Sequence, residues 1–361
     1  MKVNRKWLTA LILLMICVFI HFYSIDAHRV ENGYSSRFFP VFSRFLRNAF
    51  GAIPVSIGDI LYGLLVGLMI WRFIKWLIDL KKKRELPVSH RVKNRLLNTV
   101  ITLSWLYIIF NIFWGINYNR KGIAFQLQLN IEKYTVKELK NMNGLLVGKI
   151  NNSRQVITDQ RKPFPTNREL FKRVNDTYAE AEKKYPFIDY RPSSLKSSLW
   201  GWVGNYGGFT GYYNPFTGEA QVNTSVPAFI QPFVACHEVA HQLGYAKEME
   251  ANFVAFLAAG SSTDTLFHYS VYLELFAYAN RNLYRIDSLA ARSYSKELIP
   301  AVQGDLDEWR KFNRKHVNPA EPVIRWLYGK FLQGNQQPEG IQAYDKVTGF
   351  IIAYYKKFGR I

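Results

Sequence analysis

The sequence predicts an α-helical membrane anchor followed by an α+β domain that is mainly helical and contains a small sheet. Three apolar runs lie before residue 117, and each is about as long as the roughly 20 residues that cross a bilayer. After residue 117, apolar residues recur at helical spacing, and the segment 199–223 has the glycine and aromatic content of strands and turns. We therefore expect a membrane domain at 1–117 and a second domain at 118–361.

The net charge of the chain is strongly positive. It has 47 Lys and Arg against 27 Asp and Glu, and the resulting charge of +20 indicates a polyanionic partner, either nucleic acid or a membrane surface. Residues 1–117, which hold the apolar runs, carry a net charge of +11. No zinc-finger spacing, RNA-binding aromatic signature or basic zipper is present. We therefore expect the lipid bilayer, and no nucleic acid, as a partner.

The three expected membrane-spanning helices cover about residues 7–23, 57–78 and 96–116. Basic residues precede the first run, and residues 81–95 between the second and third contain seven Lys or Arg and one Glu. The positive-inside rule places both segments in the cytoplasm. The second domain then lies outside the bacterial inner membrane, in the periplasm. A cleaved signal peptide is the alternative for the first run, but no small-residue cleavage site follows it.

Aromatic residues near the runs give two further expectations. The segment FFPVFSRFLRNAF, residues 38–50, has the spacing of an amphipathic helix that lies on the membrane or packs on the second domain. Trp105 and Trp114 belong to the third run, and we expect them to anchor it at the membrane interface.

The second domain opens with two predicted helices. Thr135 and Glu138 form a capping box before an apolar stripe at helical spacing. A second helix is expected from a cap at Asn167 to about Tyr185.

The segment after these helices changes character. Residues 199–213 are rich in glycine and aromatics and predict strands and tight turns, not a helix. EAQVN, at 219–223, predicts a short strand. A helix is then expected from Pro232, which fits a first turn, to Gly244, a typical C-terminal cap.

This last helix contains the pattern HExxH, read as His237, Glu238 and His241. Positions i and i+4 lie one turn apart on one face, so two imidazoles can hold one metal ion. Glu238 is displaced around the helix, where it can act as general base on a zinc-activated water without being a ligand. Because the chain has only Cys17 and Cys236, its metal ligands are expected to be histidines and carboxylates. The pattern predicts Zn²⁺ as cofactor and Glu238 as the catalytic residue.

Glu248 and Glu250 are the candidates for the third ligand, and they cannot both point inward on one helix. We favour Glu248, because Asn252 lies four residues later on the same face, where its amide can orient a liganding histidine. Glu250 remains the alternative.

Residues 237–256, HEVAHQLGYAKEMEANFVAF, resemble the gluzincin branch of the zincin metallopeptidases, in which HExxH is followed by a glutamate in an E-x-x-A-[DN] setting. Membrane CAAX prenyl endopeptidases share this pattern. The chain further resembles a family of three-span membrane proteins of Bacteroidetes-type bacteria that is assigned to the zincins. The features that carry this resemblance are the three apolar runs, GYYNPFTGEAQVN at 211–223 and GIQAYDKVTGFIIAYY at 340–355. The resemblance implies a zincin-like metallopeptidase domain.

In zincins an edge strand before the metal helix binds the substrate backbone. The resemblance places this role on six residues of the chain: Gly218, Glu219, Ala220, Gln221, Val222 and Asn223. A donor for the transition-state oxyanion is also needed. Tyr344, which opens the late motif before an apolar segment, is preferred over the other candidates of suitable type, Tyr212, Tyr213, Tyr328 and His316.

The sequence therefore predicts a membrane-anchored zinc metallopeptidase that acts on a peptide or protein substrate outside the inner membrane. The alternative is a membrane sensor or structural protein whose zinc only stabilises the fold. A structural site would have no need of Glu238 and would normally take four protein ligands. Hydrolysis of a nonpeptide amide is a third interpretation, and the strand available for peptide binding makes it the weaker one.

Overall fold

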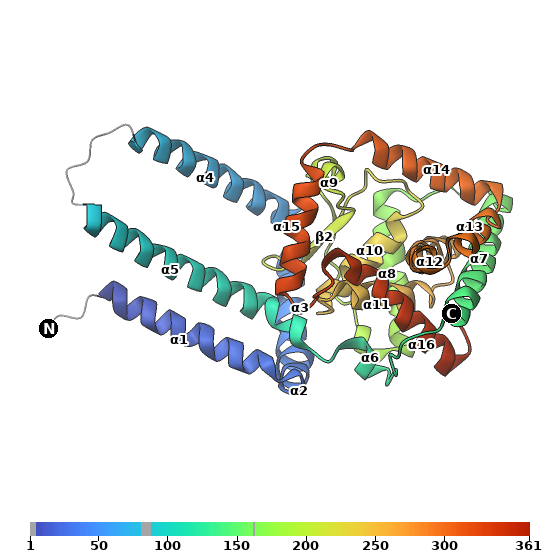
Figure 1. Ribbon diagram of the computed structural model, residues 1–361, viewed down its shortest axis with the longest axis horizontal. Coiled ribbons are helices and arrows are strands. Elements are labelled where there is room, and N and C mark those ends of the chain that lie inside the picture. The colour runs from blue at the N-terminus through green and yellow to red at the C-terminus, as the bar shows by residue number, and fades with distance from the viewer. Residues whose placement is uncertain (1–4, 81–87, 162) are drawn as a thin grey trace.

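Figure 1 shows the computed structural model of the protein, in which three long helices extend from one end of a mostly helical body. The structure describes residues 5–80, 88–161 and 163–361. The topology prediction uses basic residues that lie partly in 1–4 and 81–87. These two ranges are outside the described residues. The three long helices are α1 (Arg5–Ile25), α4 (Ile57–Leu80) and α5 (Val88–Phe113).

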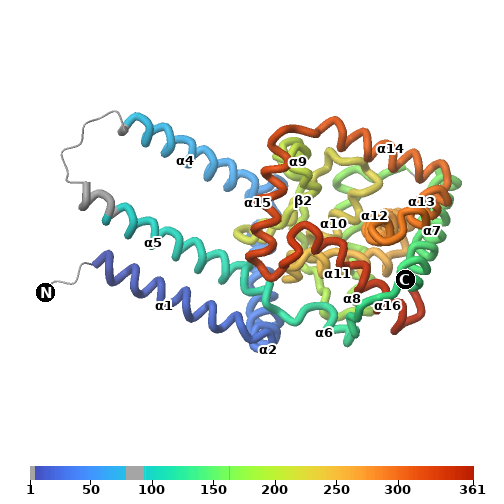
Figure 2. The backbone as a smooth tube through the Cα atoms, in the orientation of Figure 1, coloured from blue at the N-terminus to red at the C-terminus, as the bar shows by residue number. Residues whose placement is uncertain are grey.

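Among the described residues, three helices are long and apolar enough to cross a membrane, as the sequence predicts. Their apolar segments are Arg5–Ile25, Ile57–Ile78 and Arg95–Phe113. The ends of α1, α4 and α5 that point away from the body all lie on one side, as three successive spans require (Figures 1 and 2). The third helix ends at Phe113, and Trp114 is buried in the body, so the expectation that Trp114 anchors a span at the interface is wrong.

Residues 27–56, between the first two long helices, pack into the body. They form α2 (Ala27–Arg29), the π-helix η1 (Val30–Phe38) and α3 (Phe39–Gly51). In α3, the Ser43 hydroxyl donates to the carbonyl of Gln242 at 2.7 Å. This helix therefore packs on the second domain, as one of the two expectations for it states. Residues 27–56 also contact the spans, because the Tyr34 hydroxyl donates to the Ile112 carbonyl of α5 at 2.8 Å.

A buried ion pair fixes this segment to the body. Glu31 in η1 accepts from Arg120 at 2.7 and 3.0 Å, and both side chains are almost fully buried. Arg120 also donates to the carbonyl of Gly244 at 3.2 Å, at the end of the predicted metal helix.

Helices make up most of the remaining body. Before the sheet come η2 (Gly115–Asn119), α6 (Gly122–Gln126), α7 (Val136–Asp159), α8 (Asn167–Lys184) and η3 (Pro186–Ile188). After the sheet come α10 (Gln231–Gln242), α11 (Glu248–Ala259), α12 (Thr265–Ile286), α13 (Ser288–Lys296), α14 (Pro300–Lys315), α15 (Glu321–Gly334), η4 (Gly340–Lys346) and α16 (Val347–Phe358).

The predicted capping of α7 is confirmed, and that of α8 begins one residue earlier than expected. Thr135 and Glu138 make both hydrogen bonds of a capping box. In α8 the capping box is made by Thr166 and Glu169, so Asn167 is the first helical residue and not the cap. Threonine at this position accepts from the backbone amide three residues later.

One apolar core holds the body together. α7, α8, α10, α11, α12 and α16 enclose it, and its fully buried side chains include Leu139, Val174, Val239, Phe253 and Val271. α10 is buried along its whole length, which fixes any side chain that it presents to the interior.

The small sheet has three strands in the order β1-β3-β2. β1 (Leu195–Ser197) is parallel to β3 (Glu219–Val222), and β2 (Gly211–Asn214) is antiparallel to it. A helix, α9 (Gly201–Gly207), stands where the sequence indicated only strands and turns.

The expectation that Gly218–Asn223 forms a free edge is wrong. β3 pairs with a neighbour on both sides, so its backbone cannot accept a further strand. The reason is β1, a three-residue strand with no alternating pattern that the sequence could reveal. The sheet edge available beside the predicted metal helix is β2.

Candidate metal centre

α10 presents His237 and His241 one turn apart on the same face. Pro232 lies in its first turn, where the missing amide is harmless, and Gly244, at a φ of +88°, follows the helix end. The two imidazole rings lie 4.7 Å apart between centroids and nearly perpendicular. The spacing predicted from the sequence therefore brings both side chains to one point.

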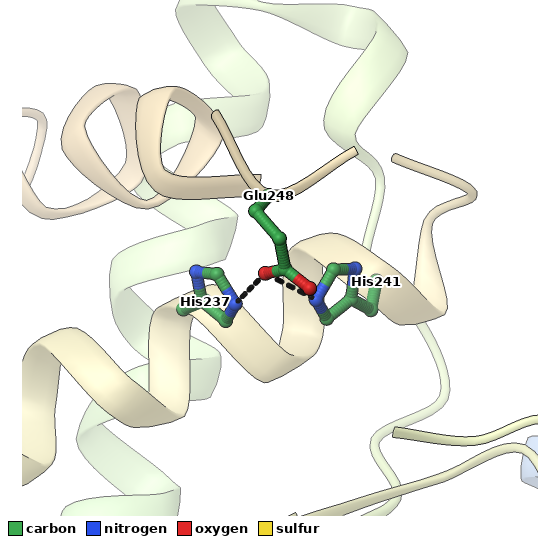
Figure 3. Close-up of side chains that lie close together, drawn as sticks. All are labelled: His237, His241 and Glu248. Carbon is green, nitrogen blue, oxygen red and sulfur yellow. Dashed lines mark ion pairs between the residues drawn. The ribbon is translucent and has the colours of Figure 1, made fainter. Parts of the chain in front are cut away.

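Glu248, the first residue of α11, reaches the same point. Its Oε2 atom lies 3.2 Å from Nε2 of His237 and 3.5 Å from Nε2 of His241 (Figure 3). One ligand atom from each of the three residues lies within 4.8 Å of the others. Oε1 of Gln337 accepts a hydrogen bond from the backbone amide of Glu248 at 3.0 Å, which fixes the start of the helix. These three residues could hold a metal ion.

Both imidazoles are oriented by a second hydrogen bond. Nδ1 of His237 lies 2.7 Å from Oδ1 of Asn252, and Nδ1 of His241 lies 2.7 Å from the Tyr245 carbonyl. Each Nδ1 therefore donates its proton, and each Nε2 is the ring atom that faces Glu248 and could bind a metal ion once it carries no proton. Asn252 occupies the place that the sequence suggested for it.

The converging atoms fit a cation. The two Nε2 atoms and the buried Oε2 of Glu248 face one another, and such a contact needs a proton or a metal ion between its atoms. No hydrogen bond from the described residues reaches Oε2 of Glu248. Burial alone would lower the pKa of His241, but the Glu248 carboxylate raises that pKa to about 9. Burial would raise the pKa of Glu248, but the two imidazoles hold it well below its ordinary range.

Glu238 points from α10 toward the edge strand β2. A Cβ atom at Gly211 would lie 2.7 Å from Oε1 of Glu238, so only glycine leaves room for this carboxylate. Burial raises the pKa of Glu238 to about 7, and its Oε2 has no hydrogen-bond partner among the described residues. Because its pKa is close to neutral pH, this carboxyl group is suited to take up and release a proton there.

Glu250, the alternative ligand, lies elsewhere. Its carboxylate abuts Gly122, in a region that also contains the ion pair of Arg120 with Glu31. Burial is the main cause that raises its pKa. Glu250 is therefore absent from the group formed by Glu248 and the two histidines.

Two tyrosines complete the group. The Tyr328 hydroxyl donates to Oε1 of Glu248 at 2.7 Å, and the hydroxyls of Tyr328 and Tyr344 lie 3.1 Å apart. The Tyr344 ring is nearly parallel to that of His237, with centroids 6.3 Å apart. Burial raises the pKa of both tyrosines well above its ordinary value, so both hydroxyls stay protonated and can donate.

Residues 34–352 match the family described as Protein of unknown function (DUF3810). The chain belongs to this family. The match includes two of the three long apolar helices and nearly all of the body. No curated protein and no solved structure matches the chain.

In this DUF3810 family member, the three candidate ligands and Glu238 line a cavity of about 810 Å³, here called the cleft. Many of its lining side chains are aromatic. The Trp114 ring lies edge-on to His241 at 5.8 Å, and Phe209 lies edge-on to Tyr328 at 5.4 Å. β2 contributes Gly211 and its neighbours to the same wall.

Sequence reasoning missed several of these residues. Trp114, directly after α5, and Tyr118 in η2 line the cleft, although the sequence predicts Trp114 at the membrane interface and gives no role to Tyr118. Glu274 on α12 also lines it, and burial raises the pKa of Glu274 to about 7. No local motif marks these positions. Tyr212, a candidate donor by type, instead donates to Asp59 of α4.

Proposed function

We propose that the protein is a membrane-anchored, zincin-like zinc metallopeptidase that hydrolyses peptide bonds. The observation that carries this proposal is the convergence of His237, His241 and Glu248 in a cleft, beside the buried carboxylate of Glu238, whose Oε2 has no hydrogen-bond partner in the described part of the chain. Three protein ligands leave one coordination position of a tetrahedral ion open, which is typical of catalytic zinc sites and not of structural ones.

Zinc is the metal we infer for this donor set. Two imidazoles and one carboxylate match known catalytic zinc sites. The hydrogen bonds from Nδ1 of His237 and His241 select the tautomer in which Nε2 is the ligand atom. When bound, the ion supplies Lewis-acid activation of a water molecule and of the scissile carbonyl.

Glu238 is the proposed general base and then general acid. Its carboxylate takes one proton as the water oxygen bonds to the carbonyl carbon, and the same proton passes to the leaving nitrogen as the carbon–nitrogen bond breaks. One water is consumed, and a carboxylic acid and an amine are released, which ionise to carboxylate and ammonium when the proton left on the acid passes to the amine. Tyr328 and Tyr344 keep protonated hydroxyls beside Glu248, and we propose Tyr344 as an oxyanion donor while Tyr328 positions the ligand carboxylate.

The exposed edge of β2 is the proposed site for the substrate backbone. This strand has β3 on one side, and residues from Thr210 to Tyr213 line the cleft next to Glu238. An extended peptide can add to such an edge by main-chain hydrogen bonds. This proposal replaces the role that the sequence gave to Gly218–Asn223.

We further propose that the body lies on the periplasmic side of a bacterial inner membrane. The basic residues at the start of the chain and in 81–95 favour a cytoplasmic location for that side of the membrane. The ends of α1, α4 and α5 near these residues all lie away from the body (Figure 1). The cleft then faces extracytoplasmic substrates.

The test is hydrolysis of casein by the purified protein in detergent, with the Glu238→Gln variant and zinc content measured on both. We expect hydrolysis by the wild type, and an inert variant that keeps its zinc. Glu250→Gln, a change of another buried glutamate nearby, is the matched control and should stay active. Stoichiometric zinc with no hydrolysis of casein or of a mixed peptide pool would refute the peptidase and favour a zinc-binding sensor or structural protein.

A further inference from the structure

The cleft extends to the ends of two apolar helices. Tyr62, in the second turn of α4, and Phe110, in the last turn of α5, both line it. Trp114, one residue beyond α5, contacts the ligand His241 through its ring. The wall of the cleft beside the metal group is therefore a direct continuation of membrane-spanning segments.

Helices α9 and α15 flank this part of the cleft and are fixed to the same two spans. Trp200, which precedes α9, donates from Nε1 to the Asp59 carbonyl in α4 at 3.0 Å. Phe331 in α15 lies edge-on to Phe110 of α5, with centroids 6.2 Å apart. Figure 1 shows α9, α15 and α3 at the end of the body from which the long helices extend.

These three segments, together with Trp200 next to α9, expose large apolar side chains. Trp202 and Trp326 are each 61% exposed, although both are large aromatic residues. We call eight of these residues the interfacial face: Val41, Phe45, Trp200, Trp202, Val203, Val323, Trp326 and Leu327. Tryptophan in such a position is typical of the headgroup layer of a bilayer. An apolar surface continuous with membrane spans is best explained by contact with the same membrane.

The spans also leave a lateral opening. α1 packs against α5, whereas α4 stands apart from both (Figures 1 and 2). Every side chain of α4 from Leu64 to Ile78 is exposed. In a bilayer, lipid would therefore fill the space between α4 and α5. This space leads to Tyr62 and Phe110 at the cleft.

From this geometry, we propose that the cleft receives its substrate from the bilayer, between α4 and α5. The substrate is a polypeptide with an apolar anchor in the membrane, and it is cleaved in the extended segment next to that anchor. The segment would leave the bilayer between Tyr62 and Phe110 and pair with the edge of β2. This inference rests on the proposed peptidase activity and specifies its substrate class.

The first experiment compares peptide reporters of one sequence in proteoliposomes that contain the protein. One reporter is soluble, one carries a palmitoyl chain, and one continues into a transmembrane helix. Each anchored reporter is made with the scissile segment next to the anchor and with a flexible spacer of about 30 residues. Both anchored versions concentrate equally at the membrane, so their comparison isolates access from the bilayer.

We expect Glu238-dependent cleavage of the reporters without spacer to be at least tenfold faster than that of the spacer forms. The palmitoyl and helical reporters distinguish an acyl anchor from a polypeptide one. Equal or faster cleavage of the spacer or soluble reporters would overturn the inference and leave the peptidase standing. No cleavage of any reporter would refute the proposed function, and the substrate assignment with it.

The second experiment measures insertion of the interfacial face without using activity. Nitroxide labels are placed by Trp202→Cys or Trp326→Cys in a Cys17→Ala/Cys236→Ala background, in liposomes. Leu289→Cys is the control, because Leu289 is 78% exposed on α13, at the far end of the body. We expect oxygen to relax the first two labels more strongly than a water-soluble nickel chelate does, and the reverse at position 289. Equal behaviour of all three labels would overturn the inference.

Discussion

Removal of the hydrogen bond between Asn252 and His237 tests whether the orientation of this imidazole matters for metal binding. Its Oδ1 accepts from Nδ1 of His237 at 2.7 Å, and the side chain is fully buried. In Asn252→Ala the imidazole keeps its ring but loses its orientation and leaves Nδ1 without a partner. An unpaired buried donor costs about 1–3 kcal/mol. Loss of such a partner typically weakens metal binding about 10- to 100-fold, which corresponds to about 1.4–2.8 kcal/mol. The cost of the unpaired donor and the loss of zinc-binding free energy therefore fall in the same range.

The assay is competition for Zn²⁺ between the protein in detergent and a chromophoric chelator at fixed pH. Asn143→Ala is the matched control. Asn143 is also fully buried, and it donates to the Leu139 carbonyl at 2.8 Å within α7, remote from the cleft. We expect the control to lose stability but to bind zinc as the wild type does. Wild-type zinc affinity in Asn252→Ala would refute the reasoning.

Three further predictions follow from the site and its supports. Because the pKa of His241 is raised to about 9, its imidazole is protonated at pH 7 in the metal-free protein. Zinc binding at pH 7 should therefore release about one proton, and affinity should fall about tenfold per pH unit below 9, measurable by calorimetry in buffers of different ionisation enthalpy. Gly211→Ala should overlap the Glu238 carboxylate and lower hydrolysis about 100-fold, because small displacements of catalytic groups are costly. Glu31→Gln leaves Arg120 buried without its anion and should lower the free energy of unfolding by about 3–5 kcal/mol, measured by denaturant titration.

Each of these predictions has a control and a contrary result. Zinc binding without proton uptake or release at pH 7 would contradict the protonated state of His241. Gly148→Ala, where nothing lies within 4 Å of the new methyl group, should leave hydrolysis unchanged, and an active Gly211→Ala would place Glu238 elsewhere. Glu180→Gln breaks only a surface pair with Lys183 and should cost under about 1 kcal/mol. If Glu31→Gln lowers the free energy of unfolding no more than Glu180→Gln does, the ion pair of Glu31 with Arg120 does not fix residues 27–56 to the body.

Local spacing allowed the metal group to be predicted. His237 and His241 are one helical turn apart, and Glu248 and Asn252 share a face of the next helix, so four positions follow from the helical period. The remaining contacts join distant parts of the chain. Tyr328 reaches Glu248 from 80 residues away, and no sequence pattern specifies how α15 packs.

The sheet was predicted less well for a physical reason. β3 reads as a strand, but its position in the sheet depends on which other strands pair with it, and β1 has only three residues. Glu219 in β3 is equally instructive. Its carboxylate accepts from the backbone amides of Ile57 and Gly58 at the start of α4. Favourable charge at a helix N-terminus explains this buried glutamate, but only the folded chain reveals which helix it serves.

The zinc content of two isosteric variants tests the central claim most directly. Glu248→Gln and Glu250→Gln each neutralise a buried carboxylate near the start of α11, and only the first lies against the two histidines. The account predicts one zinc ion per chain, by mass spectrometry after dialysis, in the wild type and in Glu250→Gln, and a loss of tightly bound zinc in Glu248→Gln. Full zinc occupancy in Glu248→Gln, or no zinc in the wild type, would contradict it.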